Sequence, residues 1–183
     1  MEISEEEKEK RIELSEKLEA VFVWLFLLIL SGDMSEVVLV TVTKEKIKEV
    51  IKEHFNLSDL TAFYKDYAEK VASETVSVTL RNLTEDYFTS LDRAMLIAEN
   101  EANLLSNYEM QFEAVRNGYR FKTWITENDS RVRHTHREVH HTQIDILKPF
   151  VVGDSVMMFP KDFSLGASAK ETVNCRCVLK YSK

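Results

Sequence analysis

One long stretch without glycine or proline constrains the fold of this chain more than any other feature. Gly32 is followed by 85 residues, 33–117, that contain neither residue type. Glycine and proline mark turns and helix ends, so their absence favours long helices over folds made of many short strands. With 44% apolar residues in a chain of 183, there is enough material to bury a core. We therefore expect a helical bundle over residues 1–118.

The most apolar part of the chain lies within its first expected helix. Ser4 as the cap, with three glutamates in the first turn, predicts a helix over residues 4–30 that ends near Gly32. All 11 residues of the segment 20–30 are apolar, whereas a membrane span needs about 20. We expect no membrane helix, and a segment that is buried on several sides or docks on a partner. The sequence alone leaves open whether this chain or another covers it.

Hydrophobic spacing and capping residues place the other expected helices. Residues 36–43 are β-branched and fit either a strand or a helix start, whereas 44–54 have the spacing of a helix. Ser58 or Thr61 is expected to cap the next helix, and Thr84 the one after it. The longest apolar stripe is expected to pack along another helix and comprises Leu91, Met95, Ala98, Ala102, Leu105 and Phe112.

The composition changes after Gly118. Residues 1–118 contain 13 Lys+Arg and 24 Asp+Glu, a net charge of −11, whereas residues 119–183 contain 11 and 7, a net charge of +4. Runs typical of short strands occur at 119–126, 151–159 and 173–180. We expect an α+β fold, with a helical region at 1–118 followed by a small α+β domain at 119–183. So small a domain buries little core and needs a cross-link or support from the bundle.

Histidines and cysteines are concentrated in the second segment. On a helix, His136 and His140 stand one turn apart, so both rings can face one point. Cys175 and Cys177 on a strand can direct two thiolates to the same ion, and no other cysteine is present, which indicates a reducing compartment. Two histidines and two cysteines form a closed tetrahedral zinc set. The prediction is a structural zinc site, and the alternative is buried packing cysteines beside a solvated histidine face.

A second hypothesis assigns the same cluster to catalysis. His136 and His140, with Asp129 and either Arg131 or Arg133, would supply a general base, an acid and a phosphate clamp for cleavage of a nucleic acid. Such clusters also occur on inert helix faces, and the chain has no phosphate-binding loop, nucleophile elbow or metalloprotease motif. We therefore expect a protein that is not an enzyme, and a nuclease-like domain is the alternative.

Several blocks within residues 97–178 resemble one phage family in their order and spacing. The blocks are Ile97-Ala98 with Glu101; Trp124 with Asp129, Arg131, Arg133 and His136; Pro149-Phe150; Met158–Asp162 with Pro160; and Asn174-Cys175-Arg176-Cys177. In these blocks the chain is similar to the phage Mu F-like minor head (head morphogenesis) proteins. An arginine of the family pattern is Glu99 here, and two glycines are His141 and Lys161, so we expect altered turns at the last two.

The resemblance implies a phage or prophage minor capsid protein. Such a protein contacts portal and capsid proteins during procapsid assembly, takes part in DNA packaging or ejection, and is found in the virion and in the host cytoplasm during assembly. The positive net charge of residues 119–183 suits a location near DNA, with contacts that do not depend on the DNA sequence. Relatives also occur as toxin modules, which keeps a nuclease-like toxin as the alternative. The residues expected to hold the small domain together are Trp124, Asp129, Arg131, Arg133, His136, Pro160, Asp162, Asn174 and Arg176.

Overall fold

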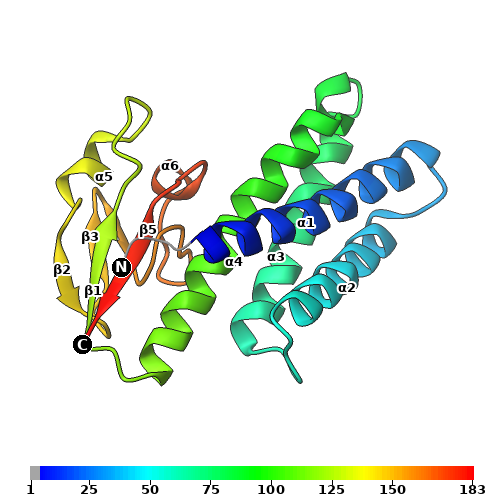
Figure 1. Cartoon of the computed structure of the whole chain (residues 1–183). Helices are drawn as coiled ribbons and strands as arrows, with labels where there is room; N and C mark the ends of the chain where they lie inside the picture. The colour runs from blue at the N-terminus through cyan, green and yellow to red at the C-terminus, as the bar shows by residue number, and fades with distance from the viewer. Residues whose placement is uncertain (1–4) are drawn as a thin grey trace. The chain divides into compact units, whose positions relative to one another are not determined.

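A computed structural model describes residues 5–183 and confirms the expected α+β class, with long helices first and short strands after them (Figure 1). The helices are α1 (Glu5–Ser31), α2 (Glu36–His54), α3 (Ala62–Arg81), the 3-10 helix η1 (Asp86–Thr89), α4 (Leu91–Arg116), α5 (His134–Glu138) and α6 (Ala169–Thr172). The strands are β1 (Phe121–Ile125), β2 (Gln143–Asp145), β3 (Phe150–Val152), β4 (Ser155–Met157) and β5 (Val178–Ser182). The expected Ser4 cap lies outside the described residues.

Contacts within the described chain define two compact units. One comprises Ile12–Glu99, and the other combines Asn100–Lys183 with the described residues up to Arg11. The division falls inside α1 and α4, so each of these two long helices contributes to both units. The domain division expected at residues 118 and 119 stays a prediction.

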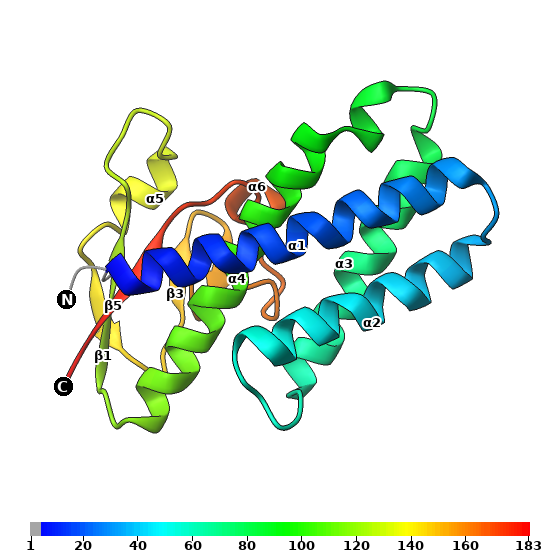
Figure 2. The ribbon, with the colours of Figure 1, turned by 45° about the vertical axis from the view of Figure 1, so that its right-hand side comes forward.

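The core of the unit Ile12–Glu99 is formed by the buried faces of its helices. After Gly32, which adopts a left-handed φ of 71°, the chain reverses and α2 runs in the opposite direction to α1 (Figure 2). Five of the 11 residues in the segment 20–30 are buried within this chain, whereas Leu27 and Leu30 are 63% and 57% exposed. Among the described helices, none combines the length and the apolar character that crossing a membrane requires.

The helix boundaries differ from the expected ones where local signals were ambiguous. Residues 36–43 continue into α2, so the β-branched run is helical throughout. Thr61 caps α3, because its side chain accepts a hydrogen bond from the Tyr64 backbone N–H. The expected helix start at Thr84 is wrong: η1 comes first, and α4 follows Ser90, whose Oγ accepts from the Arg93 backbone N–H at 3.2 Å.

The buried face of α4 also differs from the expected stripe. Ala98, Ala102 and Leu105 of that stripe are buried, as is Ala94 one turn before them, whereas Leu91, Met95 and Phe112 are exposed. The larger apolar residues at the two ends of the expected stripe therefore lie off the buried row. Alanine side chains let a neighbouring backbone approach closely, so a row of alanines marks a packed helix face as well as large residues do.

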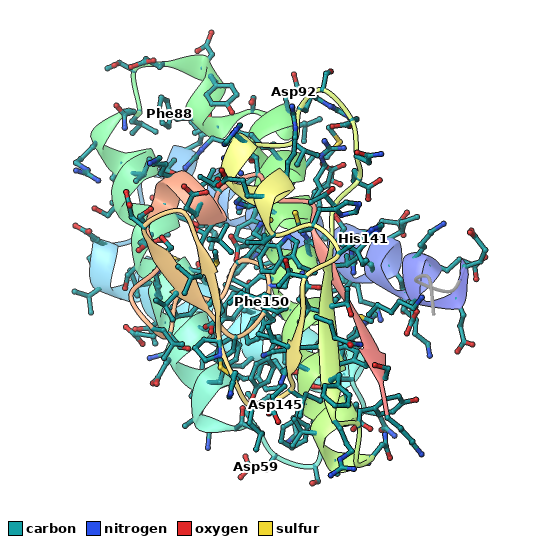
Figure 3. The ribbon with its side chains drawn as sticks, turned by 90° about the vertical axis from the view of Figure 1, so that its left-hand side faces the viewer. Asp59, Phe88, Asp92, His141, Asp145 and Phe150 are labelled. Carbon is teal, nitrogen blue, oxygen red and sulfur yellow. The ribbon has the colours of Figure 1, made fainter. Side chains whose placement is uncertain are left out.

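The second unit is organised around an antiparallel sheet with the order β2-β1-β5. β1 lies at its centre, and β3 and β4 form a separate hairpin. Phe150 of β3 lies between the hairpin and the sheet (Figure 3), with its ring centroid 5.2 Å from that of Trp124 on β1. Lys122 is buried beside it, and its Nζ donates a hydrogen bond to the Met158 carbonyl at 2.6 Å.

A row of buried amides on α4 holds the later segments of this unit. Asn103, Asn107 and Gln111 follow one another at intervals of four, so they share one face of the helix. The Asn103 side chain donates to the Cys175 carbonyl at 2.6 Å, and Asn107 donates to the Cys177 carbonyl at 3.2 Å. Gln111 donates to the carbonyl of Ile146 at 3.0 Å. These three residues, the amide row, satisfy backbone groups that lie outside the sheet.

Candidate metal centre

The two cysteines lie in an irregular segment between α6 and β5. The expected strand at 173–180 is wrong in its first part, because β5 begins only at Val178. Asn174 adopts a left-handed φ of 54°, and its backbone N–H donates to the Asn100 side-chain oxygen at 2.9 Å. The amide row binds the carbonyls of both cysteines in place of a neighbouring strand, and this leaves both sulfur atoms directed to the same side.

His136, Cys175 and Cys177 bring three metal-ligating atoms within 4.8 Å of one another. The Nδ1 atom of His136 lies 3.3 Å from the Cys177 Sγ and 3.6 Å from the Cys175 Sγ. In a tetrahedral zinc site, bonds of about 2.3 Å to sulfur and about 2.0 Å to nitrogen separate the two ligand atoms by about 3.5 Å. The two separations from Nδ1 therefore fit a shared ion, and all three residues are buried.

Glu171 occupies the other side of the His136 ring. Its Oε2 lies 3.1 Å from the His136 Nε2 and accepts a hydrogen bond from the Thr135 hydroxyl at 2.8 Å. A carboxylate accepts a hydrogen bond from Nε2–H, which leaves the Nδ1 lone pair free and directed at the sulfur atoms. Glu171 is 1% exposed, and α6 places it there. Its position is that of an orienting partner for a ligating histidine.

The thiols also differ from each other electrostatically. The hydrogen bond from Cys177, followed by that of His136, lowers the pKa of Cys175 well below that of an ordinary thiol. The same hydrogen bond and burial raise the pKa of Cys177. A bound cation supplies the positive charge that allows both sulfur atoms to be thiolates.

His140 lies outside this group. The helix α5 ends at Glu138, so His136 and His140 are not on one helix face as expected. The Nδ1 atom of His140 instead accepts a hydrogen bond from the Thr126 backbone N–H at 3.1 Å. Burial, and then the neighbouring His141, lower the pKa of His140.

An ion pair connects the loop after β1 to the cysteine segment. The Arg176 guanidinium donates to both carboxylate oxygens of Asp129, at 2.7 and 2.8 Å. These hydrogen bonds, with one from the Arg131 backbone N–H, lower the pKa of Asp129 to about 2. Arg131 itself is mostly exposed, and Arg133 donates to the backbone carbonyl of Val173. Asp129, Arg133 and Arg176 thus connect the loop after β1 to the cysteine segment.

The remaining motif residues shape the surrounding core and turns. Trp124 is fully buried on β1, with its ring centroid 5.7 Å from the His136 ring. The Asp162 carboxylate is also fully buried and accepts backbone hydrogen bonds from Met158 and Ser164, each at 2.9 Å. Pro160 presents its carbonyl to Asn107 at 3.5 Å. These residues lie around the metal-ligand group without joining it.

The two turns where glycine was expected keep a backbone that glycine adopts readily. Lys161 has a φ of 73° and His141 a φ of 64°. His141 lies at the loop labelled in Figure 3. The Lys161 side chain is buried, and its Nζ donates to both the backbone and the side-chain oxygen of Asn100. Burial lowers the pKa of this lysine to about 8.

The sequence prediction missed the partners that hold the ligands in place. Glu171 sits four residues before the first cysteine, and nothing in its spacing distinguishes it from a surface glutamate. The amide row carries a clearer signal, because polar amides at intervals of four on one face of an otherwise apolar helix indicate buried hydrogen bonds.

Comparison with known proteins finds a family whose match spans this centre. The family described as "Phage Mu protein F like protein" matches residues 43–180, three quarters of the chain. Searches among curated proteins and among solved structures find no match. The family match connects the chain to phage head morphogenesis and extends from within α2 into β5, including all three metal-ligating residues. The chain therefore belongs to the phage Mu protein F-like family.

Proposed function

We propose that the chain is a minor head protein that acts in procapsid assembly and in DNA packaging or ejection, through contacts with portal and capsid proteins in the virion. We also propose that a zinc ion bound by His136, Cys175 and Cys177 cross-links its C-terminal part. The family match is the observation that carries the first proposal. The fit of three buried ligand atoms to tetrahedral zinc carries the second.

Exposed apolar side chains at the turn between α1 and α2 support a role in protein contacts. The five are Leu27, Leu30, Met34, Val37 and Val38, and Val37 is 75% exposed. Contiguous exposed apolar residues are typical of protein interfaces. The turn between α1 and α2 is therefore the surface that we assign to a portal or capsid contact. We assign the position near DNA to segment 119–183, which is more basic than the rest of the chain.

The alternative, a nuclease-like toxin domain, receives no support from the arrangement of its expected residues. It requires His136 and His140 to reach a substrate together, and His136 is 1% exposed. Asp129 is held by Arg176. Overproduction in a bacterial host separates the two functions: a nuclease-like toxin arrests growth and His136→Ala relieves the arrest, whereas a head protein leaves growth unchanged.

Co-production with the portal and major capsid proteins of the same phage tests the assembly role. We expect the chain to co-purify with procapsids, and Leu30→Glu to reduce its amount because a charge in an apolar contact is costly. Ile12→Glu is the matched control, since Ile12 is 59% exposed on the same helix but lies far from the turn. Procapsids that never contain the chain contradict the proposal.

Elemental analysis of the purified protein tests the zinc assignment. We expect one zinc per chain, and Cys177→Ser to lose both the zinc and part of the thermal stability. Ser182→Ala controls for effects of substitution near β5, because Ser182 is half-buried at the end of that strand and lies outside the centre. A Cys175→Ser/Cys177→Ser variant that keeps its zinc content and its fold refutes the zinc proposal.

A further inference from the structure

The metal-ligand group contains three side chains, one fewer than a closed tetrahedral site. Among residues 5–183, no fourth histidine, cysteine or carboxylate places a ligand atom within the same group. Glu171 bonds to the far nitrogen of the imidazole ring, and His140 bonds to Thr126. Structural zinc sites have four protein ligands, whereas sites with three keep the last position for water or another exchangeable ligand.

A small cavity lies against the same three ligands. It has a volume of about 20 Å³, and His136, Cys175 and Cys177 form part of its lining. One water molecule needs at least about 10–15 Å³ by this measure, so the cavity has room for a single water or a very small anion. The cavity is partly open to solvent, so a small linear anion that binds the metal at one end can extend outward. The space beside the ligands therefore matches one exchangeable ligand in size and in place.

The charge around the cavity favours an anionic ligand. Arg131, Arg133 and Arg176 line it, together with one carboxylate residue, Glu127. Asp129 neutralises Arg176 through two short hydrogen bonds, whereas the described contact of the Arg133 guanidinium is to a backbone carbonyl. Two thiolates balance the charge of a divalent metal, so a hydroxide or other anion in the fourth position needs a nearby cation. Arg133 supplies that cation.

We infer that the metal centre is open, and that its fourth ligand is a water molecule that small anions displace beside Arg133. This inference rests on the proposed zinc site and extends it, because an open centre binds an external ligand and a closed one does not. The expected ligand class is a monovalent inorganic anion of two or three atoms at most.

Cobalt substitution with azide as the probe tests this inference without an activity assay. The full chain is loaded with Co²⁺ in place of zinc, and its visible absorption spectrum is recorded as azide is added. We expect one Co²⁺ per chain and a saturable change in the ligand-field bands, because azide enters the coordination shell. We expect Arg133→Gln to weaken azide binding about tenfold while the cobalt content stays at one per chain.

A matched control uses another arginine of the same loop region. Arg137 donates to the Ser130 carbonyl and does not line the cavity, so Arg137→Gln should leave azide binding unchanged. A cobalt-loaded protein whose spectrum ignores saturating azide has a closed centre and refutes this inference alone. A cobalt spectrum that changes in His140→Ala identifies His140 as the fourth ligand and also refutes it. A chain that takes up no metal refutes both this inference and the zinc proposal.

Discussion

Replacement of Glu171 by glutamine tests whether this carboxylate orients the metal-ligating histidine. The substitution keeps the shape of the side chain and removes its negative charge. The Glu171 Oε2 lies 3.1 Å from the His136 Nε2 in a site that is 1% exposed, so bulk water does not replace the lost interaction. A glutamine that turns its NH₂ group toward Nε2 would also favour the tautomer with the proton on Nδ1, which cannot bind a metal.

The magnitude follows from the loss of a charged acceptor. A neutral hydrogen bond contributes about 1 kcal/mol. A hydrogen bond to a charged group is about twice as strong. The expected loss is therefore about 1 kcal/mol, or about fivefold in the zinc dissociation constant. This is just below the roughly 10–100-fold range for outer-shell partners of ligating histidines. Glu171→Ala, which also leaves the Thr135 hydroxyl without its acceptor, should approach the upper end.

Competition for zinc with a chromogenic chelator measures this change, and thermal unfolding of the metal-free protein is recorded in parallel. Glu138→Gln is the control, because Glu138 is an exposed carboxylate on the same short helix as His136. We expect the control to bind zinc like the wild type. A Glu171→Gln variant with an unchanged zinc dissociation constant and a lower stability without metal would show that Glu171 only supports the fold.

Four further substitutions have defined outcomes. Trp124→Ala should lower the free energy of unfolding in urea by about 3–5 kcal/mol, because the residue is fully buried. Gly153→Ala should lower the melting temperature, since Gly153 has a φ of 56° and a Cβ there would lie 2.9 Å from a Glu171 carboxylate oxygen; an unchanged melting temperature would contradict this geometry. The pKa of Asp129 is lowered to about 2, so its contribution is present above pH 4 and is lost as pH falls toward 2; melting temperatures of wild type and Asp129→Asn should converge over that interval. Burial lowers the pKa of Lys122 to about 8, so wild-type stability should rise relative to that of Lys122→Met as pH increases from about 8 to 10.5. A wild-type stability that falls relative to that of the variant over this interval would refute the lowered pKa.

Local sequence signals were sufficient for most of the helices and for the ligand types. The absence of glycine and proline between 33 and 117 correctly indicated long helices, and Thr61 acts as the cap that its position suggested. Residues 36–43 show where such signals are insufficient. Their β-branched side chains suit a strand or a helix, and the tertiary setting decides between the two because the neighbouring segments are helices.

The metal centre was predictable in its chemistry and not in its geometry. His136, Cys175 and Cys177 meet as expected, but a spacing of four residues implies a shared helix face only when the helix continues. The helix α5 ends before His140, and a left-handed residue, His141, follows it. Glu171 could not be recognised, because its role depends on a contact with a residue 35 positions earlier in the chain.

The amide row has a consequence for the variation that this protein can tolerate. Asn103, Asn107 and Gln111 bind main-chain carbonyls, and every amino acid carries one. An exchange at Ile146 or Pro160 therefore leaves the bond to α4 available, whereas an exchange of any of the three amides breaks it whatever the partner. Mutations should thus accumulate unequally, because the side chain at a bonded position such as Ile146 can change without loss of the bond, whereas the three amides, and Cys175 and Cys177 as the proposed metal ligands, cannot change.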